Sequence, residues 1–502
     1  MKLITIIRSF PSTASCLKIR SLQIFTVSAI LFLTACASDQ TRQEQGEGQR
    51  QIIVQNVTVI DAVDGLRENQ SVVVSGDQIV AVGEAEDIAV PEGAEVVDGQ
   101  GRYLIPGLWD AHVHLTNTPA MRQAMFPLMI VNGITYVRDT AAELDDILAM
   151  REESVRLAES EGMAPDVYIL GHHIDGRWLS WDSSVSAVTS EEALAHMNEL
   201  EEVGVDEMKV YELLSPEVFH TVVQEAADRG YKVTAHVPLT MDVVEASDAG
   251  LSAMEHMQNL ELSCSGVWQE MLDERRQLIA EGTDLTGNEF RQSLKELHTL
   301  RALQTQDDER CSEVLGTLAR NQTWQIPTLT ITTLEGHRLY DRPQWRETFR
   351  YLPEQVEAAW LEQAEQMSQT VSSEAGLAYS EWVRTIIPQL PELGIPVMAG
   401  TDMPLALLTP GFSLHAELEL LAEAGLSPMQ VLHAATVAPA EWYGLEEKQG
   451  RIAEGMAADL VLLGENPLED ITATRNIEAV VRAGFLHTRS DLDEILHQLE
   501  SQ

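Results

Sequence analysis

Short runs of β-branched residues alternate with turn residues from Gln51 onward. The runs IIVQNVTVIDAVDG, SVVVSGDQIVAVG and AEVVDGQGRYLIPG are punctuated by Asp-Gly, Ser-Gly-Asp and Gly-Gln-Gly turns, which is typical of short strands. The runs ADLVLLGENP and IEAVVRAGFLH near the other end of the chain have the same character. We therefore expect both ends to build one small composite β-sandwich, from residues 51–105 and 446–490, with 491–502 as a C-terminal tail.

Between these parts, residues 106–445 alternate strand-like and helix-like stretches, as parallel βα units do. Eight such strands predict an α/β fold, a (β/α)8 TIM-type barrel. Two stretches, 262–322 and 335–385, exceed normal loop length and are rich in helix formers, so we expect them to cover the active site at the C-terminal face of the barrel. The strands are expected near 106–114, 134–139, 167–171, 207–211, 232–236, 252–256, 324–330 and 395–401.

The first 35 residues indicate an export signal. Basic residues precede an apolar run, Leu22 to Ala35, which is too short for a comfortable membrane span. The run ends in Leu33-Thr34-Ala35-Cys36, which resembles a bacterial lipobox. The alternative is an ordinary signal peptide followed by a chance cysteine. The lipobox predicts a signal peptide over 1–35, a lipid on Cys36 that holds the protein on a membrane, and a flexible tether over 36–50.

Ala37 follows the proposed lipidated cysteine, and by analogy with Gram-negative lipoproteins it favours the outer membrane. We therefore expect an exported protein at the periplasmic face of that membrane or on the cell surface. With Cys16 in the leader and Cys36 lipidated, Cys264 and Cys311 remain. An oxidising periplasm favours one disulfide, but the sequence does not bring the two residues together.

The chain carries a net charge of -46, which would repel phosphate backbones, so nucleic acid is excluded as a partner. The hydrophobic content of 44% indicates a globular protein. The sequence indicates no oligomeric state.

Polar, metal-competent residues stand where apolar strands are expected to end. His112 and His114 share one strand face in Asp110-Ala111-His112-Val113-His114, and barrel enzymes keep their chemistry at this end of the strands. A lone His-x-His pair is weak evidence, and a single histidine is more often a satisfied core residue. Six such groups at successive strand ends favour a metal site instead: His112, His114, Lys209, His236, His256 and Asp402.

Lys209 is the most diagnostic of the six. Past the leader the chain has only three other lysines, so Lys209 is unlikely to be surface filler, and it is predicted to share an inward face with Tyr211. One interpretation is a buried lysine paired to a carboxylate. The other is a lysine carbamate formed with CO2, an anion whose two oxygens can bridge two cations.

The order His-x-His, Lys, His, His, Asp resembles the binuclear amidohydrolase superfamily. PGLWDAHVHL resembles the first barrel strand of that superfamily. The segment from AGTD through GFSLHAELELLAEAGLSPMQVLHAATVAPAEWYGLEEKQGRIAEGMAADLVLLGENPLEDI resembles its imidazolonepropionase-like and Xaa-Pro dipeptidase-like branch. The resemblance covers about Gln51 to His487 and implies the same barrel with a composite β-sandwich.

The resemblance also implies a ligand set. His112, His114 and Asp402 would hold one divalent metal, and His236 and His256 the second, while carboxylated Lys209 and a hydroxide would bridge the two. Zinc suits these ligands, and Mn or Co would fit as well. Imidazolonepropionase resembles a one-metal variant without the lysine, so Lys209 argues against that activity.

The resulting functional hypothesis is a hydrolase acting on a carbon–nitrogen bond of a small molecule, a dipeptide or an N-acyl amino acid, through the metal-bridging hydroxide. Asp402 would carry the proton to the leaving amine. Tyr211 could stabilise the oxyanion or be a packed barrel residue, and His172 and His173 could contact substrate or lie on a loop surface. The alternatives are an esterase or lactonase using the same site, and a surface-tethered binding lipoprotein with a vestigial site.

Overall fold

A computed structural model describes residues 50–501 of the chain. The predicted signal peptide, the lipobox with Cys36 and nearly all of the tether lie outside the described residues. Among residues 50–501, no helix is both long enough and apolar enough to cross a membrane.

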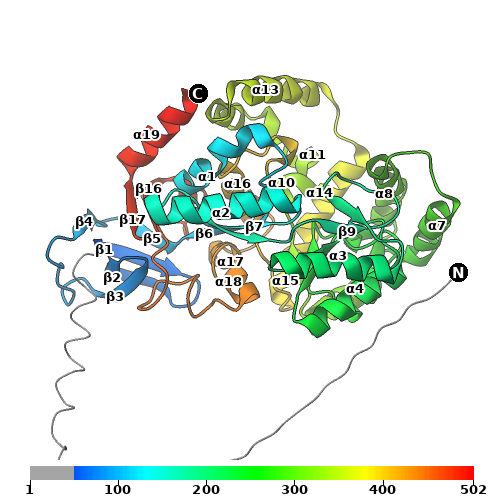
Figure 1. The fold of residues 1–502 in the computed structure, drawn as a ribbon, viewed down its shortest axis with the longest axis horizontal. Coiled ribbons are helices and arrows are strands. Elements are labelled where there is room, and N and C mark those ends of the chain that lie inside the picture. The colour runs from blue at the N-terminus through cyan, green and yellow to red at the C-terminus, as the bar shows by residue number, and fades with distance from the viewer. Residues whose placement is uncertain (1–49, 502) are drawn as a thin grey trace, which may run out of the picture. The chain divides into compact units, whose positions relative to one another are not determined.

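Strands from both ends of the chain form one eight-stranded sheet (Figure 1). The sheet order is β17-β16-β15-β5-β1-β2-β3, with β4 paired to β1. The N-terminal and C-terminal parts meet where β15 runs antiparallel to β5, from the pair Leu460–Pro106 to the pair Leu463–Tyr103. The composite β unit expected from the sequence is confirmed. Its strands are β1 (Gln51–Asp61), β2 (Gly65–Ser75), β3 (Gln78–Glu84), β4 (Glu95–Asp98), β5 (Tyr103–Pro106), β15 (Leu460–Leu463), β16 (Ile477–Arg482) and β17 (Phe485–Thr488).

Parallel strands in two sheets form the barrel. The first sheet has the order β6-β7-β8 and the second the order β10-β9-β11-β12-β13-β14. The strands are β6 (Leu108–Val113), β7 (Ile134–Asp139), β8 (Asp166–Ile169), β9 (His173–Asp175), β10 (Ser184–Ser186), β11 (Met208–Val210), β12 (Val233–Ala235), β13 (Ala253–Glu255) and β14 (Trp324–Ile326).

The eighth predicted strand, 395–401, makes single bridges instead of a ladder. Val397 pairs with Gln325 of the β14 strand, and Met403 pairs with Val113 at the end of β6. On the other side, the backbone N–H of Asp206 donates to the carbonyl of Ile169 in β8 at 2.8 Å. These contacts join the two sheets on both sides, although the ladders are not continuous around the ring. The predicted barrel fold is confirmed, with shorter strands than expected.

Helices follow the strands and pack outside them (Figure 1). Helices α2, α3 and α4 contact β8, β10 and β12. Local signals set their ends: α3 begins at a capping box formed by Thr189 and Glu192, and it stops at Gly204, whose φ of 76° suits a residue without a Cβ. The outer helices are α1 (Arg122–Val131), α2 (Leu144–Glu161), α3 (Ser190–Val203), α4 (Pro216–Arg229), α5 (Val243–Asp248), α16 (Phe412–Glu423), α17 (Pro428–Ala434) and α18 (Val437–Tyr443).

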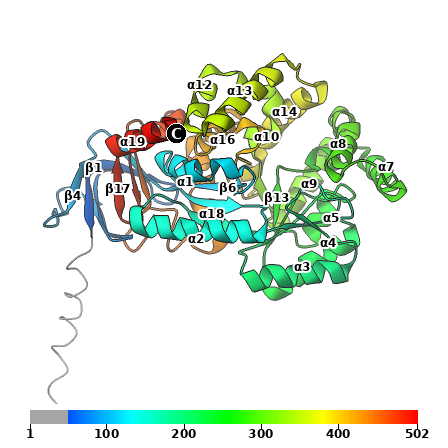
Figure 2. The ribbon, with the colours of Figure 1, turned by 45° about the horizontal axis from the view of Figure 1, so that its top comes forward.

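The two long stretches are helical, as predicted, and they appear as two groups around α8 and α13 in Figure 2. In the first group a disulfide joins Cys264 to Cys311, which settles the pairing that the sequence left open. The first group is α6 (Leu260–Ser263), α7 (Trp268–Glu281), α8 (Gly287–Gln304) and α9 (Asp308–Asn321). The second is α10 (Leu329–Thr332), α11 (Leu334–His337), α12 (Pro343–Arg346), α13 (Glu354–Gln369), α14 (Glu374–Ile386) and α15 (Gln389–Glu392).

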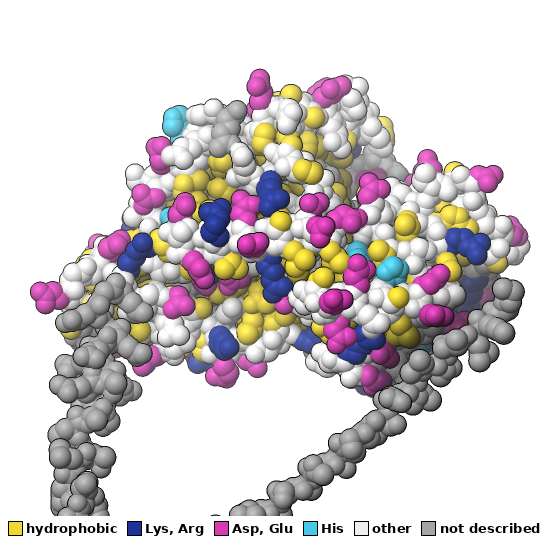
Figure 3. All heavy atoms as spheres, in the orientation of Figure 1, with side chains coloured by type: hydrophobic (Ala, Val, Ile, Leu, Met, Phe, Trp, Pro, Cys, Tyr) yellow, Lys and Arg dark blue, Asp and Glu magenta, His cyan; other side chains and the backbone are white. Residues whose placement is uncertain are grey.

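The C-terminal end differs from the expected tail. Residues Arg489–Glu500 form helix α19, which begins at a capping box between Thr488 and Asp491 and buries Leu492 and Leu499. On the face shown in Figure 3, Asp and Glu side chains are spread out and do not gather in one patch.

Candidate metal centre

Three of the predicted ligands meet at the end of β6. His112 and His114 point the same way because they lie two residues apart on one strand. Their Nε2 atoms lie 3.0 Å and 2.9 Å from Oδ1 of Asp402. One ligand atom from each of the three buried residues lies within 4.8 Å of the others.

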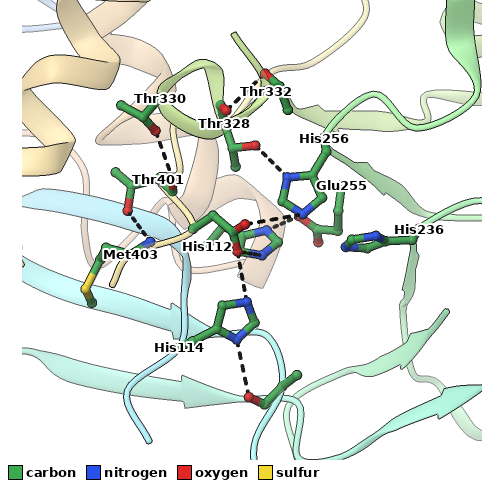
Figure 4. Close-up of polar contacts among 12 residues, drawn as sticks. His112, His114, His236, Glu255, His256, Thr328, Thr330, Thr332, Thr401 and Met403 are labelled. Carbon is green, nitrogen blue, oxygen red and sulfur yellow. Dashed lines mark hydrogen bonds and ion pairs between the residues drawn. The ribbon is translucent and has the colours of Figure 1, made fainter. Parts of the chain in front are cut away.

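Two further histidines continue this group (Figure 4). Nε2 of His256 lies 4.0 Å from the second oxygen of Asp402. The ring of His256 lies between those of His112 and His236, with centroid distances of 4.6 Å and 4.5 Å. Asp402 therefore faces His112 and His114 with one oxygen and His256 with the other.

Each of the four histidines has its Nδ1 atom occupied by a hydrogen-bond acceptor. Nδ1 of His112 faces Glu255 Oε2 at 2.6 Å, and Nδ1 of His236 faces Glu212 Oε1 at 3.0 Å. Nδ1 of His114 faces the Ala141 carbonyl at 3.3 Å. These acceptors place the ring proton on Nδ1 and leave the lone pair on Nε2, which is how metal-binding histidines are commonly oriented.

His256 follows the same rule through a hydroxyl. Its Nδ1 lies 2.6 Å from Thr328 Oγ1, and that hydroxyl donates its own proton to the Pro327 carbonyl at 2.8 Å. Thr328 can therefore only accept from the ring. The four Nε2 lone pairs are all available to a ligand.

The donor chemistry and the packing both fit a divalent metal. Nε2 of His112 and Oδ1 of Asp402 are buried at 3.0 Å from each other, yet neither has a hydrogen-bond partner among residues 50–501. Buried polar atoms are rarely left without a partner. Two imidazole nitrogens and a carboxylate oxygen are ligands that zinc accepts, so a bound cation would satisfy both atoms.

Glu255 is the main residue that the sequence analysis missed. Its Oε1 accepts from Arg138 Nη1 at 2.9 Å and from Thr234 at 2.5 Å, while its Oε2 faces His112. Burial alone would raise the pKa of Glu255, but Arg138 and His112 outweigh burial and hold that pKa well below its ordinary value. Glu255 therefore stays charged and fixes the ring of His112.

Arg138 links this pair to a second buried carboxylate. Its Nε and Nη2 donate to the two oxygens of Glu207 at 2.9 Å each. Glu207 also accepts from Trp442 at 2.8 Å and from the Tyr443 hydroxyl. The Arg138–Glu207 pair beneath the histidines is thus bidentate and buried, and bidentate Arg–carboxylate contacts are among the stronger charge-assisted hydrogen bonds.

The backbone around the centre adopts conformations that non-glycine residues rarely use. His256, Thr328 and Asp402 have φ angles of 58°, 46° and 70°. Such residues cluster at functional sites, where the surrounding structure holds them in place. At His256 this turn brings two consecutive residues, Glu255 and His256, to the same centre, although a regular strand would point them to opposite faces.

Gly400 allows the segment that carries Asp402 to approach β6. A Cβ atom at this position would lie 2.7 Å from His112 Cβ and 2.8 Å from His112 N, closer than packing allows. The glycine of the Ala-Gly-Thr-Asp motif is therefore required for the contact between Asp402 and the two histidines.

Lys209 is buried in the same region, with 1% of its surface exposed. Its Nζ lies 5.9 Å from the centroid of the Tyr211 ring. Burial lowers the pKa of Lys209 to about 8, although the carboxylates of Glu255 and Asp402 oppose the shift. The amine is thus far easier to deprotonate than an exposed lysine.

Tyr211 lies in the wall beside His236. Its ring centroid is 4.2 Å from that of His236 and 4.4 Å from that of His173. Its hydroxyl accepts from Trp181 Nε1 at 2.7 Å. The first helical insertion also reaches this wall, because Arg291 of α8 donates to Glu212 at 3.1 Å. The first insertion thus contacts the carboxylate that faces His236, and the expectation that both insertions cover the active site stays a prediction.

His172, predicted as a catalytic candidate, has its ring contact on the side of α3 and not with Tyr211. Adjacent residues alternate in direction at β9, so His173 faces Tyr211 while His172 makes its ring contact with His196 of α3, at 5.6 Å. Burial lowers the pKa of His172 to about 4. Of the two candidates, His173 lies against Tyr211 in the wall of the centre, while His172 lies against His196.

Comparison with known proteins identifies related sequences. The family model of the amidohydrolase family matches residues 103–486. Adenine deaminase from Desulforamulus reducens is 24% identical over 135 residues, which cover 27% of this chain and 22% of the deaminase. The match thus spans about a fifth of that relative's length.

Solved structures share the fold. Bottromycin amidohydrolase superposes with a TM-score of 0.69 at 20% identity and covers 94% of each chain. A Xaa-Pro dipeptidase solved with methionine in its active site superposes with a TM-score of 0.60 at 18% identity, over 87% of this chain and 100% of the dipeptidase. These likenesses show a shared fold and agree with the barrel and β unit that the resemblance in the sequence implied.

Proposed function

Because the chain belongs to the amidohydrolase family, we propose that it is a metal-dependent hydrolase that cleaves the carbon–nitrogen bond of a dipeptide or an N-acyl amino acid. One observation carries this proposal. His112, His114 and Asp402 converge at the barrel mouth, and acceptors on the Nδ1 atoms leave the Nε2 lone pairs free. The likeness to a Xaa-Pro dipeptidase supports the choice of substrate.

The proposed centre holds two divalent cations, with zinc the best match to the ligands. His112, His114 and Asp402 would bind one cation, and His236 and His256 the other. Lys209, buried beside these residues, would bridge them as a carbamate. Bound cations would supply hydroxide near neutral pH and polarise the scissile carbonyl.

The protein's own groups would move the proton and hold the substrate. Asp402 would take the proton of the attacking water and deliver it to the leaving nitrogen, because its second oxygen faces the same space as the first. The Tyr211 hydroxyl already accepts from Trp181, so its own proton is free to be donated to a developing oxyanion.

Arg291 provides the proposed recognition of a substrate carboxylate. Its Nη1 donates to Glu212 and its Nε donates to Asn288. Within the described part of the chain, Nη2 is therefore left to bind a substrate. The guanidinium lies 5.8 Å from the Tyr211 ring centroid and 5.3 Å from that of Trp181. A buried arginine beside the centre favours a substrate that ends in a free carboxylate.

The test is turnover of metal-loaded protein on matched substrates: dipeptides and N-acyl amino acids, the same compounds with an amidated C-terminus, and ester or lactone analogues. We expect amide hydrolysis, and Asp402→Asn should reduce it by about 10²–10⁴-fold or more. Cleavage of esters or lactones without any amide would favour an esterase instead. Metal binding without turnover would favour a binding protein with a vestigial site.

Arg291→Gln tests the substrate class separately. We expect KM to rise about tenfold or more for substrates with a free carboxylate and to stay unchanged for amidated ones. Arg301→Gln is the matched control, because Arg301 lies on the same helix and pairs at 2.6 Å with the exposed Glu270. If Arg291→Gln changed KM equally for both kinds of substrate, the proposed contact between Arg291 and the substrate carboxylate would be ruled out.

A further inference from the structure

A second group of metal-competent residues lies on the outer side of β9. His172, His196 and Glu199 each offer one ligand atom, and these atoms lie within 4.8 Å of one another. His172 precedes β9, while His196 and Glu199 stand one helical turn apart on α3. We call these three residues the outer triad, and we propose that it binds a divalent transition-metal ion of the zinc class.

The hydrogen bonds of His196 prepare it as a ligand. Its Nε2 donates to the Ser186 carbonyl at 3.1 Å, which places the ring proton on that atom. Nδ1 is left with its lone pair and faces Glu199 Oε2 at 4.0 Å. An imidazole whose other nitrogen donates to a backbone carbonyl is the arrangement found in many metal sites.

His172 supplies the independent observation. It is 5% exposed, and its Nε2 is buried without a hydrogen-bond partner among residues 50–501. Buried ring nitrogens are normally satisfied, and here no donor or acceptor fills that role. A cation at the outer triad gives the buried imidazole a partner that the protein does not provide.

The geometry allows the triad to close. Tetrahedral zinc with bonds of about 2.0–2.1 Å separates its ligand atoms by about 3.3 Å. The side chain of Glu199 is 56% exposed and that of His196 is 26% exposed, so both can adjust, whereas buried His172 stays fixed. Two imidazoles and one carboxylate leave the fourth position to water.

The outer triad is separate from the central site, but the two are linked through consecutive residues of the chain. His172 is adjacent to His173, whose ring lies against Tyr211. An ion bound there would fasten the start of β9 to α3 and so steady that wall of the barrel. Binding to the folded state alone would also raise the melting temperature.

The test starts from holoenzyme with its central site filled. Cobalt(II) is added as the probe, and bound metal is counted after dialysis while the visible absorption of four-coordinate cobalt is followed. His196→Ala and Glu199→Gln should each bind one equivalent less than the wild type and lose the added absorption. Turnover should remain that of the wild type, and excess zinc should raise Tm only where the triad is intact.

A matched control is available on the next helix. His220 of α4 faces Glu245 at 3.5 Å and so forms a similar His–Glu pair, but the two residues lie outside the outer triad. His220→Ala should keep the additional equivalent. The proposal is overturned if His196→Ala and Glu199→Gln bind as much metal as the wild type, or if His220→Ala loses the same equivalent. Glu199→Gln alters only an exposed side chain, so misfolding cannot account for its result.

Discussion

Replacing Glu255 with glutamine tests how the buried network prepares the metal centre. One oxygen of Glu255 accepts from Arg138 at 2.9 Å, and the other faces Nδ1 of His112 at 2.6 Å. An amide has one oxygen and one NH2 group, so it can serve only one of these partners. Either Arg138 loses a charged acceptor, or the amide donates to Nδ1 and moves the ring proton of His112 to Nε2.

The second outcome removes the lone pair that the metal needs. Loss of such a supporting contact typically lowers metal affinity by about 10–100-fold. The first outcome weakens a buried ion pair, and breaking one costs about 3–5 kcal/mol when a charge is left without a partner. Arg138 keeps Glu207, with two contacts of 2.9 Å, so we expect a loss of about 1.5–3 kcal/mol in unfolding free energy, the range for one charged hydrogen bond.

Two assays separate these effects. Metal affinity is measured by competition with a chromophoric chelator, and the unfolding free energy of the metal-free protein by urea denaturation. Glu274→Gln is the control, because Glu274 accepts from His298 Nε2 at 3.0 Å in the helical insertion, outside the barrel. A Glu255→Gln variant that matches this control in both assays would refute the role of Glu255.

Three further predictions concern the bridge, the anchor and the pH dependence. Lys209→Ala should lose activity and one bound metal, and acetate or propionate should partly restore both by taking the place of the bridging carbamate. Lys209→Arg should not be rescued. Full activity of Lys209→Ala without added acid would show that Lys209 is a structural lysine. Cys36 is predicted to be the acylated N-terminus, so Cys36→Ser should shift the protein from the membrane to the soluble fraction, and unchanged fractionation would contradict this. Burial lowers the pKa of His337 to about 4, and its ring donates to the Thr330 carbonyl while accepting from Leu339 N. The unfolded chain therefore binds a proton first as pH falls below about 6.5, and the contribution of His337 to stability decreases by up to about 1.4 kcal/mol per pH unit between pH 6.5 and 4. Urea denaturation of His337→Gln should show a shallower decrease, and an identical slope would contradict the buried neutral ring.

The strand rule predicted that His112 and His114 would face the same way, and they do. Alternation places residues two apart on one face, and both His112 and His114 contact Asp402. Asp402 was predicted as a ligand because an apolar strand ends at a Gly-Thr-Asp motif. The residues that orient these ligands were missed, since Glu255 and Thr328 contact them across 143 and 72 positions of sequence.

Backbone detail explains the remaining differences. Alternation could not choose between His172 and His173, because the sequence does not fix the register of a three-residue strand such as β9. The same rule would have separated Glu255 from His256, but the left-handed backbone at His256 cancels it. The disulfide between Cys264 and Cys311 depends on how α6 and α9 pack, which the sequence does not encode locally.

The measurement that tests the central proposal most directly is the metal content of active protein. The His196→Ala variant, which lacks the outer triad, should contain two divalent metals per chain by elemental analysis when it is purified with zinc and bicarbonate. Chelation should abolish amide hydrolysis, and adding metal back should restore activity in proportion to the metal bound at the central site, with His196→Ala used to exclude the outer triad. Full activity with no more than one metal per chain in that variant, or activity that survives complete removal of metal, would contradict the account.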